Sequence, residues 1–265
     1  MPKLRAIIRC GVGYDVIDVP TATENGILVV NIPDYCIEEA SNHAIALLLS
    51  VAKKVLLLDG YVRRNHWDEA QTILCPMPSV SGQILGVIGC GNLGKSTARK
   101  AQCLNMSVLG YDHHMDKVEA DRYGIELMSL SDVLERSDFV SIHLPLNKET
   151  FHFIGEKELR KMKPSAYLIN TARGAVVDES TLIKALQEKW IAGAGLDVFE
   201  YEPVTPDNPL VRMDSVIMTP HTASYSDAAF QKLRRSTGQE AARVLMGRWP
   251  KKIVNKDVKP KFAFS

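Results

Sequence analysis

The sequence predicts an α/β fold with a doubly wound parallel sheet, in which helices cover both faces. Two observations carry this prediction. Short, nearly continuous apolar runs alternate with helical segments through the middle of the chain, which is typical of strands buried on both faces. A glycine triplet also joins the first of these runs to the helical segment after it. The strands are expected at residues 84–88, 107–111, 139–143, 166–170, 192–197 and 216–219.

Helical periodicity predicts helices between these strands. Apolar side chains recur at helical spacing over residues 93–103 and 130–135. Asp178 and Glu179 provide the acidic start of a further helix that extends to about residue 189. Strands and helices therefore alternate along the chain, as they do in a doubly wound sheet.

The two ends of the chain differ from its middle. Residues 3–9 and 27–32 predict strands, residues 37–65 predict one long helix, straight or bent, and residues 226–247 predict a helix with Gly247 past its end. Neither end can form a domain alone, so we expect both to come together as a smaller substrate lobe. The expected division is 1–77 and 226–265 for that lobe and 78–225 for the sheet domain, with hinges near residues 76–81 and 224–226.

Composition excludes several classes of protein. The 265 residues are 46% hydrophobic, which suffices for one large domain or for two modest domains with cores of their own. The chain contains 32 Lys and Arg and 31 Asp and Glu, so its charges nearly cancel. The net charge therefore favours neither nucleic acid nor an anionic membrane as a partner. The longest apolar stretch, residues 44–58, contains Lys53 and Lys54 and is too short to span a bilayer.

The five cysteines lack metal-binding spacing, and their number is odd. We therefore expect reduced thiols in a cytoplasmic protein without a metal site. His113 and His114 are adjacent but lack a third ligand, so two surface histidines are favoured over a metal pair. The first residues do not have the shape of a signal peptide.

The glycine triplet Gly89-x-Gly91-x-x-Gly94 predicts a dinucleotide site in a Rossmann-type domain. A triplet alone fits a simple turn equally well, but this one follows a strand and opens a helix. Backbone N–H groups and the helix N-terminus can then face a pyrophosphate. Asp112 ends the second strand, where a carboxylate binds both ribose hydroxyls and repels a 2′-phosphate. The expected cofactor is NAD, in preference to NADP.

His143 and Pro145 end another strand at the same edge of the sheet. Pro145 lacks a backbone donor and stiffens the strand end, which suits a wall for the adenosine half of the cofactor. For His143, a structural role and a cofactor contact both stay open.

Polar residues at the ends of three further strands predict a catalytic site. Reduction of a 2-oxo acid needs a cation, a proton donor and a hydride source close to the reacting carbon. Arg173 can grip carboxylate and carbonyl oxygens with its planar fork. His221 can act as the acid in reduction and the base in oxidation, while Glu202 holds its second ring nitrogen and favours the protonated ring. Asp197 can accept a hydrogen bond from the nicotinamide carboxamide.

Each of these residues alone also fits an ordinary salt bridge or turn. Their joint position at the carboxyl ends of consecutive strands favours the catalytic interpretation. Residues 9–13, Arg-Cys-Gly-Val-Gly, follow the first predicted strand. Two glycines there can turn several N–H groups toward a carboxylate, and a simple turn is the alternative.

Together these motifs resemble the D-isomer-specific 2-hydroxyacid dehydrogenase family. The matching segments cover nearly the whole chain: residues 9–18, 31–33, 86–94, 112, 143–150, 170–179, 193–203 and 219–221. Within the family, bacterial relatives of C-terminal-binding protein are most similar, at residues 33–39, 220–226 and 254–257.

The resemblance implies a flavodoxin-like substrate lobe beside the Rossmann-type domain and a homodimer built mainly through the nucleotide domain. It implies catalysis by Arg173, Glu202 and His221, with Arg9, Val12, Gly13, Arg173 and His221 on the substrate. The NAD contacts that it implies are Gly89, Gly91, Asn92, Leu93, Gly94, Asp112, His143, Leu144, Pro145, Thr150, Thr171, Ala172, Arg173, Asp197, His221 and Ala223.

Three departures from the family pattern stand out. Members usually begin earlier, so we expect the N-terminal part of the substrate lobe to be absent and its sheet edge to be exposed. Asn92 stands where many members carry Arg. Residues 41–43, Ser-Asn-His, replace a more usual acidic residue before histidine.

Three functions stay open at this point. An NAD-dependent D-2-hydroxyacid dehydrogenase, or 2-oxoacid reductase, is favoured because Arg173, Glu202 and His221 are all present. An NAD(H)-responsive binding protein needs the cofactor site and the hinge but not these three groups. A truncated chain that binds NAD without turnover is supported by the short N-terminus.

Overall fold

The computed structural model describes residues 3–265 and divides into two compact units. The terminal unit comprises the chain up to Cys36 together with Ser224–Ser265, and the sheet unit comprises Ile37–Ala223. The second division lies close to the predicted boundary at 225. The first lies at residue 36 and not at 77, so residues 37–77 belong to the sheet unit. The substrate-binding role of the lobe stays a prediction.

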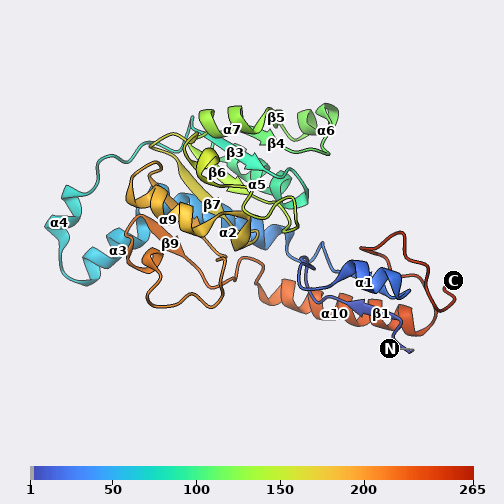
Figure 1. The fold of residues 1–265 in the computed structure, drawn as a ribbon. Helices are drawn as coiled ribbons and strands as arrows, with labels where there is room; N and C mark the ends of the chain where they lie inside the picture. The colour runs from blue at the N-terminus through green and yellow to red at the C-terminus, as the bar shows by residue number, and fades with distance from the viewer. Residues whose placement is uncertain (1–2) are drawn as a thin grey trace. The chain divides into compact units, whose positions relative to one another are not determined.

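The sheet unit contains the predicted parallel sheet, with seven strands in the order β5-β4-β3-β6-β7-β8-β9 (Figure 1). From β3 the chain builds the sheet outward first on one side and then on the other, which confirms the doubly wound fold. The strands are β3 (Ile84–Ile88), β4 (Ser107–Tyr111), β5 (Glu126–Leu127), β6 (Phe139–Ile142), β7 (Tyr167–Asn170), β8 (Gly193–Leu196) and β9 (Val216–Met218). Only the two-residue strand β5 lacks a counterpart among the predicted strands.

Successive strand residues point to opposite faces of the sheet, and each face has its own core. Phe139 packs in the first core with the buried residues of α2 (Ile37–Ala52) and α5 (Asn92–Cys103). Its neighbour Val140 packs in the second core with α7 (Leu130–Arg136), α8 (Glu156–Leu159) and α9 (Glu179–Gln187). A further helix, α6 (Lys117–Arg122), precedes β5.

Helix α2 belongs with the sheet because its apolar side packs directly on it. A side chain at Gly195 of β8 would place its Cβ 2.9 Å from the Cβ of Leu47, so the glycine permits this close approach. The predicted long helix is interrupted at Lys54, which has a left-handed φ of 52°. The chain continues as α3 (Val55–Arg63), none of whose residues is buried, and α4 (Trp67–Thr72). Both helices lie to one side of the sheet (Figure 1).

The terminal unit contains two parallel strands, β1 (Ala6–Ile8) and β2 (Leu28–Val30), with α1 (Val19–Glu24) and α10 (Asp227–Leu245). Both predicted strands and the predicted C-terminal helix are therefore present. The side chain of Asn255 accepts from Val29 N at 2.8 Å and donates to Ile27 O at 2.9 Å. An amide side chain thus satisfies one backbone group in β2 and one directly before it. Across residues 3–265, no helix combines the length and apolar character needed to cross a membrane.

Candidate active site

The register of the sheet brings the predicted catalytic segments to one edge. Asn170 of β7 pairs with Leu196 of β8, and Leu196 pairs with Met218 of β9. These strands are parallel, so the residues that directly follow them share the carboxyl edge. Arg173, Asp197, Glu202 and His221 all lie in the segments that leave this edge.

His221 and Glu202 form a hydrogen-bonded pair. The Nδ1 of His221 lies 2.7 Å from Oε2 of Glu202, and the side chains are 45% and 35% exposed. The other carboxylate oxygen of Glu202 accepts from the backbone N–H of Phe199 at 3.0 Å, which fixes its orientation. Because Nδ1 donates to the carboxylate, Nε2 is the ring nitrogen suited to proton transfer.

The backbone at His221 is tied to the end of β8. Its φ is +53°, in the left-handed region, and its N–H donates to the carbonyl of Asp197 at 2.8 Å. A non-glycine residue in this region carries some strain, which the neighbouring hydrogen bonds must offset. The segment 219–223 is therefore a turn with a defined shape that presents the imidazole.

Asp197 is fully buried and holds that turn through its carboxylate. Oδ1 accepts from Thr219 Oγ1 at 2.6 Å and from Thr222 N at 2.9 Å, and Oδ2 accepts from Ala223 N at 2.8 Å. These donors compensate the cost of burying the charge. The predicted hydrogen bond from a nicotinamide carboxamide to Asp197 stays a prediction.

Arg173 lies in a turn that Asn170 shapes. The Asn170 side chain accepts from Ala172 N at 3.0 Å and donates to Arg173 O at 2.9 Å. The turn leads into the short helix η1 (Gly174–Val176), where a Cβ at Gly174 would lie 1.8 Å from the carbonyl carbon of Phe199. Glycine thus lets the Arg173 turn pack against the segment that leads to Glu202. Asn170 is a functional candidate that the sequence analysis missed, although a polar residue at the end of an apolar strand is a usable signal.

The glycine loop has the form expected of a pyrophosphate cradle. Gly89 has a φ of +91°, and a Cβ at Gly94 would lie 2.1 Å from Gly89 O. Gly91 differs, because a Cβ there would meet no atom within 4 Å. The protein's own packing therefore does not require glycine at this position, and the space beside Gly91 is open, as the predicted pyrophosphate contact requires. Asn92 and Leu93 begin α5, whose first N–H groups face the loop.

Asp112 is joined to the same loop. Its Oδ2 accepts from Cys90 N at 2.7 Å, and its Oδ1 accepts from His114 N at 2.7 Å. The carboxylate therefore stands at the end of β4 in a fixed orientation beside the glycines. Burial, together with the nearby Asp112 charge, raises the pKa of the Cys90 thiol to about 12, so this cysteine is a packing residue and no nucleophile.

His143 directly follows β6, and burial lowers the pKa of its ring to about 4, which favours the neutral form. Its Nε2 lies 2.9 Å from Ser141 Oγ. Thr150 braces the loop that follows, since its hydroxyl donates to Pro145 O at 2.6 Å and accepts from Asn147 N at 2.8 Å. Cofactor contacts from this loop, including Leu144, and from Thr171, Ala172 and Ala223 stay predictions.

The predicted substrate loop, residues 9–13, lies in the terminal unit and is closed on itself. Arg9 donates from Nε to Gly13 O and from Nη1 to Cys10 O, both at 3.0 Å. Asn31 donates to Val12 O at 2.7 Å. The guanidinium of Arg9 therefore shapes the loop, and substrate contact by Arg9, Val12 and Gly13 stays a prediction.

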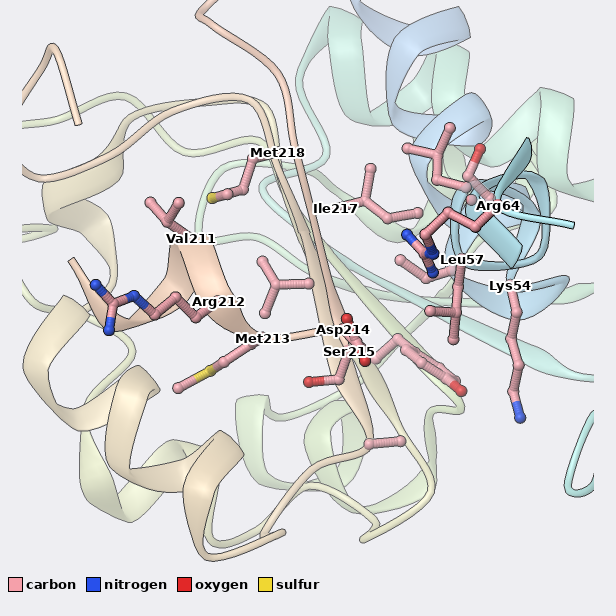
Figure 2. Close-up of a pocket in the computed structure, with 17 residues that line it drawn as sticks. Lys54, Leu57, Arg64, Val211, Arg212, Met213, Asp214, Ser215, Ile217 and Met218 are labelled. Atoms are coloured by element: carbon pink, nitrogen blue, oxygen red, sulfur yellow. The ribbon is translucent and has the colours of Figure 1, made fainter. Parts of the chain in front are cut away.

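A separate cavity of about 540 Å³ lies between α2 and α3 on one side and β9 and η2 (Pro209–Arg212) on the other (Figure 2). Figure 2 shows Arg64 extending toward Ile217, whereas the Lys54 side chain points away from the segment 211–218. None of the predicted catalytic or cofactor residues lines it. Within residues 3–265, His, Cys, Asp and Glu side chains form no group of three or more that could hold a metal ion.

Two glycine substitutions test whether the loop at residues 89–94 binds the pyrophosphate. Gly91→Ala is expected to raise the Kd for NADH about 10-fold or more, because the methyl group enters the space for the pyrophosphate, and to leave Tm unchanged. Gly94→Ala is expected to lower the stability by about 1–3 kcal/mol, because its Cβ collides with Gly89 O. Fluorescence titration and thermal unfolding measure both quantities. Unchanged NADH affinity in Gly91→Ala contradicts the cradle.

Comparisons with known proteins bear on the family and the fold of the chain. Residues 45–223 match the family described as D-isomer specific 2-hydroxyacid dehydrogenase, NAD binding domain. The chain is 43% identical over 258 residues to a glyoxylate reductase from Korarchaeum cryptofilum, covering 97% of this chain and 78% of that protein.

Solved structures of other proteins are similar to this chain over most of its length. A D-lactate dehydrogenase from Aquifex aeolicus, complexed with NAD and lactic acid, is similar at a TM-score of 0.86 with 34% identity, over 93% of this chain and 78% of that chain. An NADPH-dependent glyoxylate/hydroxypyruvate reductase from Sinorhizobium meliloti is similar at a TM-score of 0.91 with 29% identity, over 100% and 82%. The finer likeness to C-terminal-binding protein stays a prediction.

Proposed function

The chain belongs to the D-isomer specific 2-hydroxyacid dehydrogenase family, and from that premise we propose that it is an NADH-dependent reductase of glyoxylate or a similarly small 2-oxo acid. Family membership makes it an NAD-dependent oxidoreductase that interconverts a D-2-hydroxy acid and a 2-oxo acid. The observation that carries the proposed site is the His221–Glu202 pair, 2.7 Å apart, at the edge that also bears Arg173 and Asp197.

Each polar group at this edge has a role in the proposed reaction that follows from its chemistry. Arg173 binds the substrate carboxylate and polarises the carbonyl, because a guanidinium presents parallel N–H donors to two oxygens. His221 gives its Nε2 proton to the carbonyl oxygen during reduction, and Glu202 stabilises the ring through Nδ1. Asp197 would hold the nicotinamide carboxamide by accepting a hydrogen bond from it. NADH, when bound, supplies the hydride.

The substrate class follows from the relatives. Glyoxylate reductases from Korarchaeum cryptofilum, Thermofilum pendens and Thermococcus litoralis are 43%, 41% and 40% identical to this chain over the aligned residues. Loss of absorbance at 340 nm, measured with NADH and a panel of 2-oxo acids from glyoxylate to larger acids, tests the proposal. Turnover of glyoxylate or hydroxypyruvate is expected. Absence of turnover with every acid, in protein that binds NADH, refutes the proposed activity.

Asp112 supports a preference for NADH over NADPH. Asp112→Ala is expected to lower the ratio of KM for NADPH to KM for NADH by about 10- to 100-fold, the range of one or two charge-assisted hydrogen bonds. Asp112→Ala also removes the hydrogen bond from Cys90 N and so loosens the glycine loop, which weakens the binding of both cofactors. The ratio of the two KM values therefore reports the contact with the ribose alone. Asp116→Ala is the control, because Asp116 caps α6 through its side chain and should leave the ratio unchanged. An unchanged ratio in Asp112→Ala contradicts the preference.

A homodimer accounts for the exposed apolar side chains of α3 and α4. Val55, Leu56 and Val62 of α3 are about half exposed, at 48%, 55% and 49%, and Trp67 of α4 is 63% exposed. Large apolar groups that gather on neighbouring helices are typical of an interaction surface. Sedimentation equilibrium is expected to give twice the mass of one chain, and a single-chain mass contradicts the homodimer.

Five free thiols support a cytoplasmic location.

A further inference from the structure

His43 is a half-buried histidine that the roles described above leave unused. It lies on α2, the helix that packs on the sheet beside β8 and β9, and its side chain is 23% exposed. The ring Nε2 lies 2.8 Å from Thr219 Oγ1 and 3.5 Å from Asp197 Oδ1. An imidazole from α2 therefore contacts both the residue that follows β9 and the buried carboxylate that follows β8.

The chemistry of the three groups determines the direction of each hydrogen bond. An ionised carboxylate only accepts, so the 2.6 Å contact between Thr219 Oγ1 and Asp197 uses the single hydroxyl proton. Thr219 Oγ1 must then accept from His43, and Nε2 of His43 must carry a hydrogen. The result is a directed chain, from His43 Nε2–H to Thr219 Oγ1–H to Asp197 Oδ1, in which each bond polarises the next.

This series of hydrogen bonds ends on Asp197, which shapes the turn at residues 219–223 that carries His221. The Asp197 carboxylate accepts from the N–H groups of Thr222 and Ala223, and the Asp197 carbonyl accepts from His221 N. We propose that His43 is a positioning residue that, through Thr219, holds Asp197 for the nicotinamide and holds the turn that carries His221. This role of His43 rests on the proposed function. It adds a residue of α2 to the groups that follow the sheet strands.

A purely structural contact between α2 and the sheet gives a different expectation. Buried apolar groups already attach α2, among them Leu47 against Gly195. If His43 only added to this packing, its replacement would lower Tm and leave binding and catalysis of the folded protein unchanged. If His43 positions Asp197, NADH binding and kcat must change, whereas KM for the 2-oxo acid, which depends on Arg173, must stay nearly constant.

Four variants separate these expectations. His43→Leu is expected to raise the Kd for NADH and to lower kcat by about 10- to 100-fold each, as small misplacements of reacting groups do. His43→Gln is expected to restore both values to within about threefold, because the glutamine Nε2 reaches the same position as a donor. His43→Asn places its amide where Nδ1 stands and should not restore them. Leu49→Ala, on the same helix and packed against the same core, is the stability control.

NADH affinity is measured by fluorescence on each folded variant, independently of turnover, and nitrogen-detected spectra of the histidine side chains are recorded without cofactor. The Nε2–H tautomer is expected for His43, and Thr219→Val should shift its signals. The proposal is overturned if His43→Leu changes only Tm, if Asn and Gln act alike, or if His43 carries its proton on Nδ1 alone. Failure of all 2-oxo acids as substrates would refute the proposed function, while the affinity and tautomer measurements would still decide the role of His43.

Discussion

Replacing His221 by Gln is expected to lower kcat for 2-oxo acid reduction by about 10²- to 10⁴-fold, the usual contribution of a positioned general acid. Glutamine places its amide near the position of the imidazole Nε2, but this amide cannot release a proton to the carbonyl oxygen. The Kd for NADH should change little, because the turn at residues 219–223 is held by the Asp197 carboxylate and not by the imidazole. Steady-state rates at saturating NADH and fluorescence titration measure the two effects.

The chain offers a matched control for this experiment. His66 is an exposed histidine whose Nδ1 lies 2.6 Å from Glu69, so it forms a similar pair away from the sheet. His66→Gln should leave kcat and the Kd for NADH unchanged. If His221→Gln retains turnover close to that of the unmodified protein, another group supplies the proton and the assignment of His221 is wrong.

Arg173→Lys is expected to lower kcat/KM for the 2-oxo acid by at least about 100-fold, because a lysine ammonium cannot bind two oxygens in one plane. Both the carboxylate grip and the polarisation of the carbonyl depend on that geometry. Affinity for NADH should fall far less, and Arg173→Ala should be no better than Arg173→Lys. Initial rates over a range of 2-oxo acid concentrations, with NADH saturating, measure the effect.

Arg160→Lys is the control for Arg173→Lys, because it makes the same charge-conserving change away from the site. Arg160 forms an exposed pair with Glu156 on α8 and should tolerate lysine without kinetic effect. Equal kcat/KM in Arg173→Lys and the unmodified protein contradicts a bidentate role. A loss confined to NADH affinity contradicts it as well, because it would place Arg173 on the cofactor.

Particular residues show which parts of the site were predictable. Arg173, Asp197, Glu202 and His221 stand after apolar runs, and this position alone indicates the shared edge. Asn170, Thr219 and His43 were not assigned roles, since each has a plausible structural role when considered singly. Their importance arises from contacts, and His43 meets Thr219 across a sequence separation of 176 residues.

The sequence by itself determined the alternation of strands and helices, the glycine loop at 89–94, and the order in which the polar residues leave the sheet. These features depend on local periodicity and on the few residues of one turn. The tertiary structure alone decided that α2 belongs with the sheet, that the helix breaks at Lys54, and that Gly174 lies against Phe199. It also decided the chain of hydrogen bonds from His43 to Asp197. The physical reason is that strand register and helix packing place distant residues within hydrogen-bond distance, and no local pattern encodes which distant groups will meet.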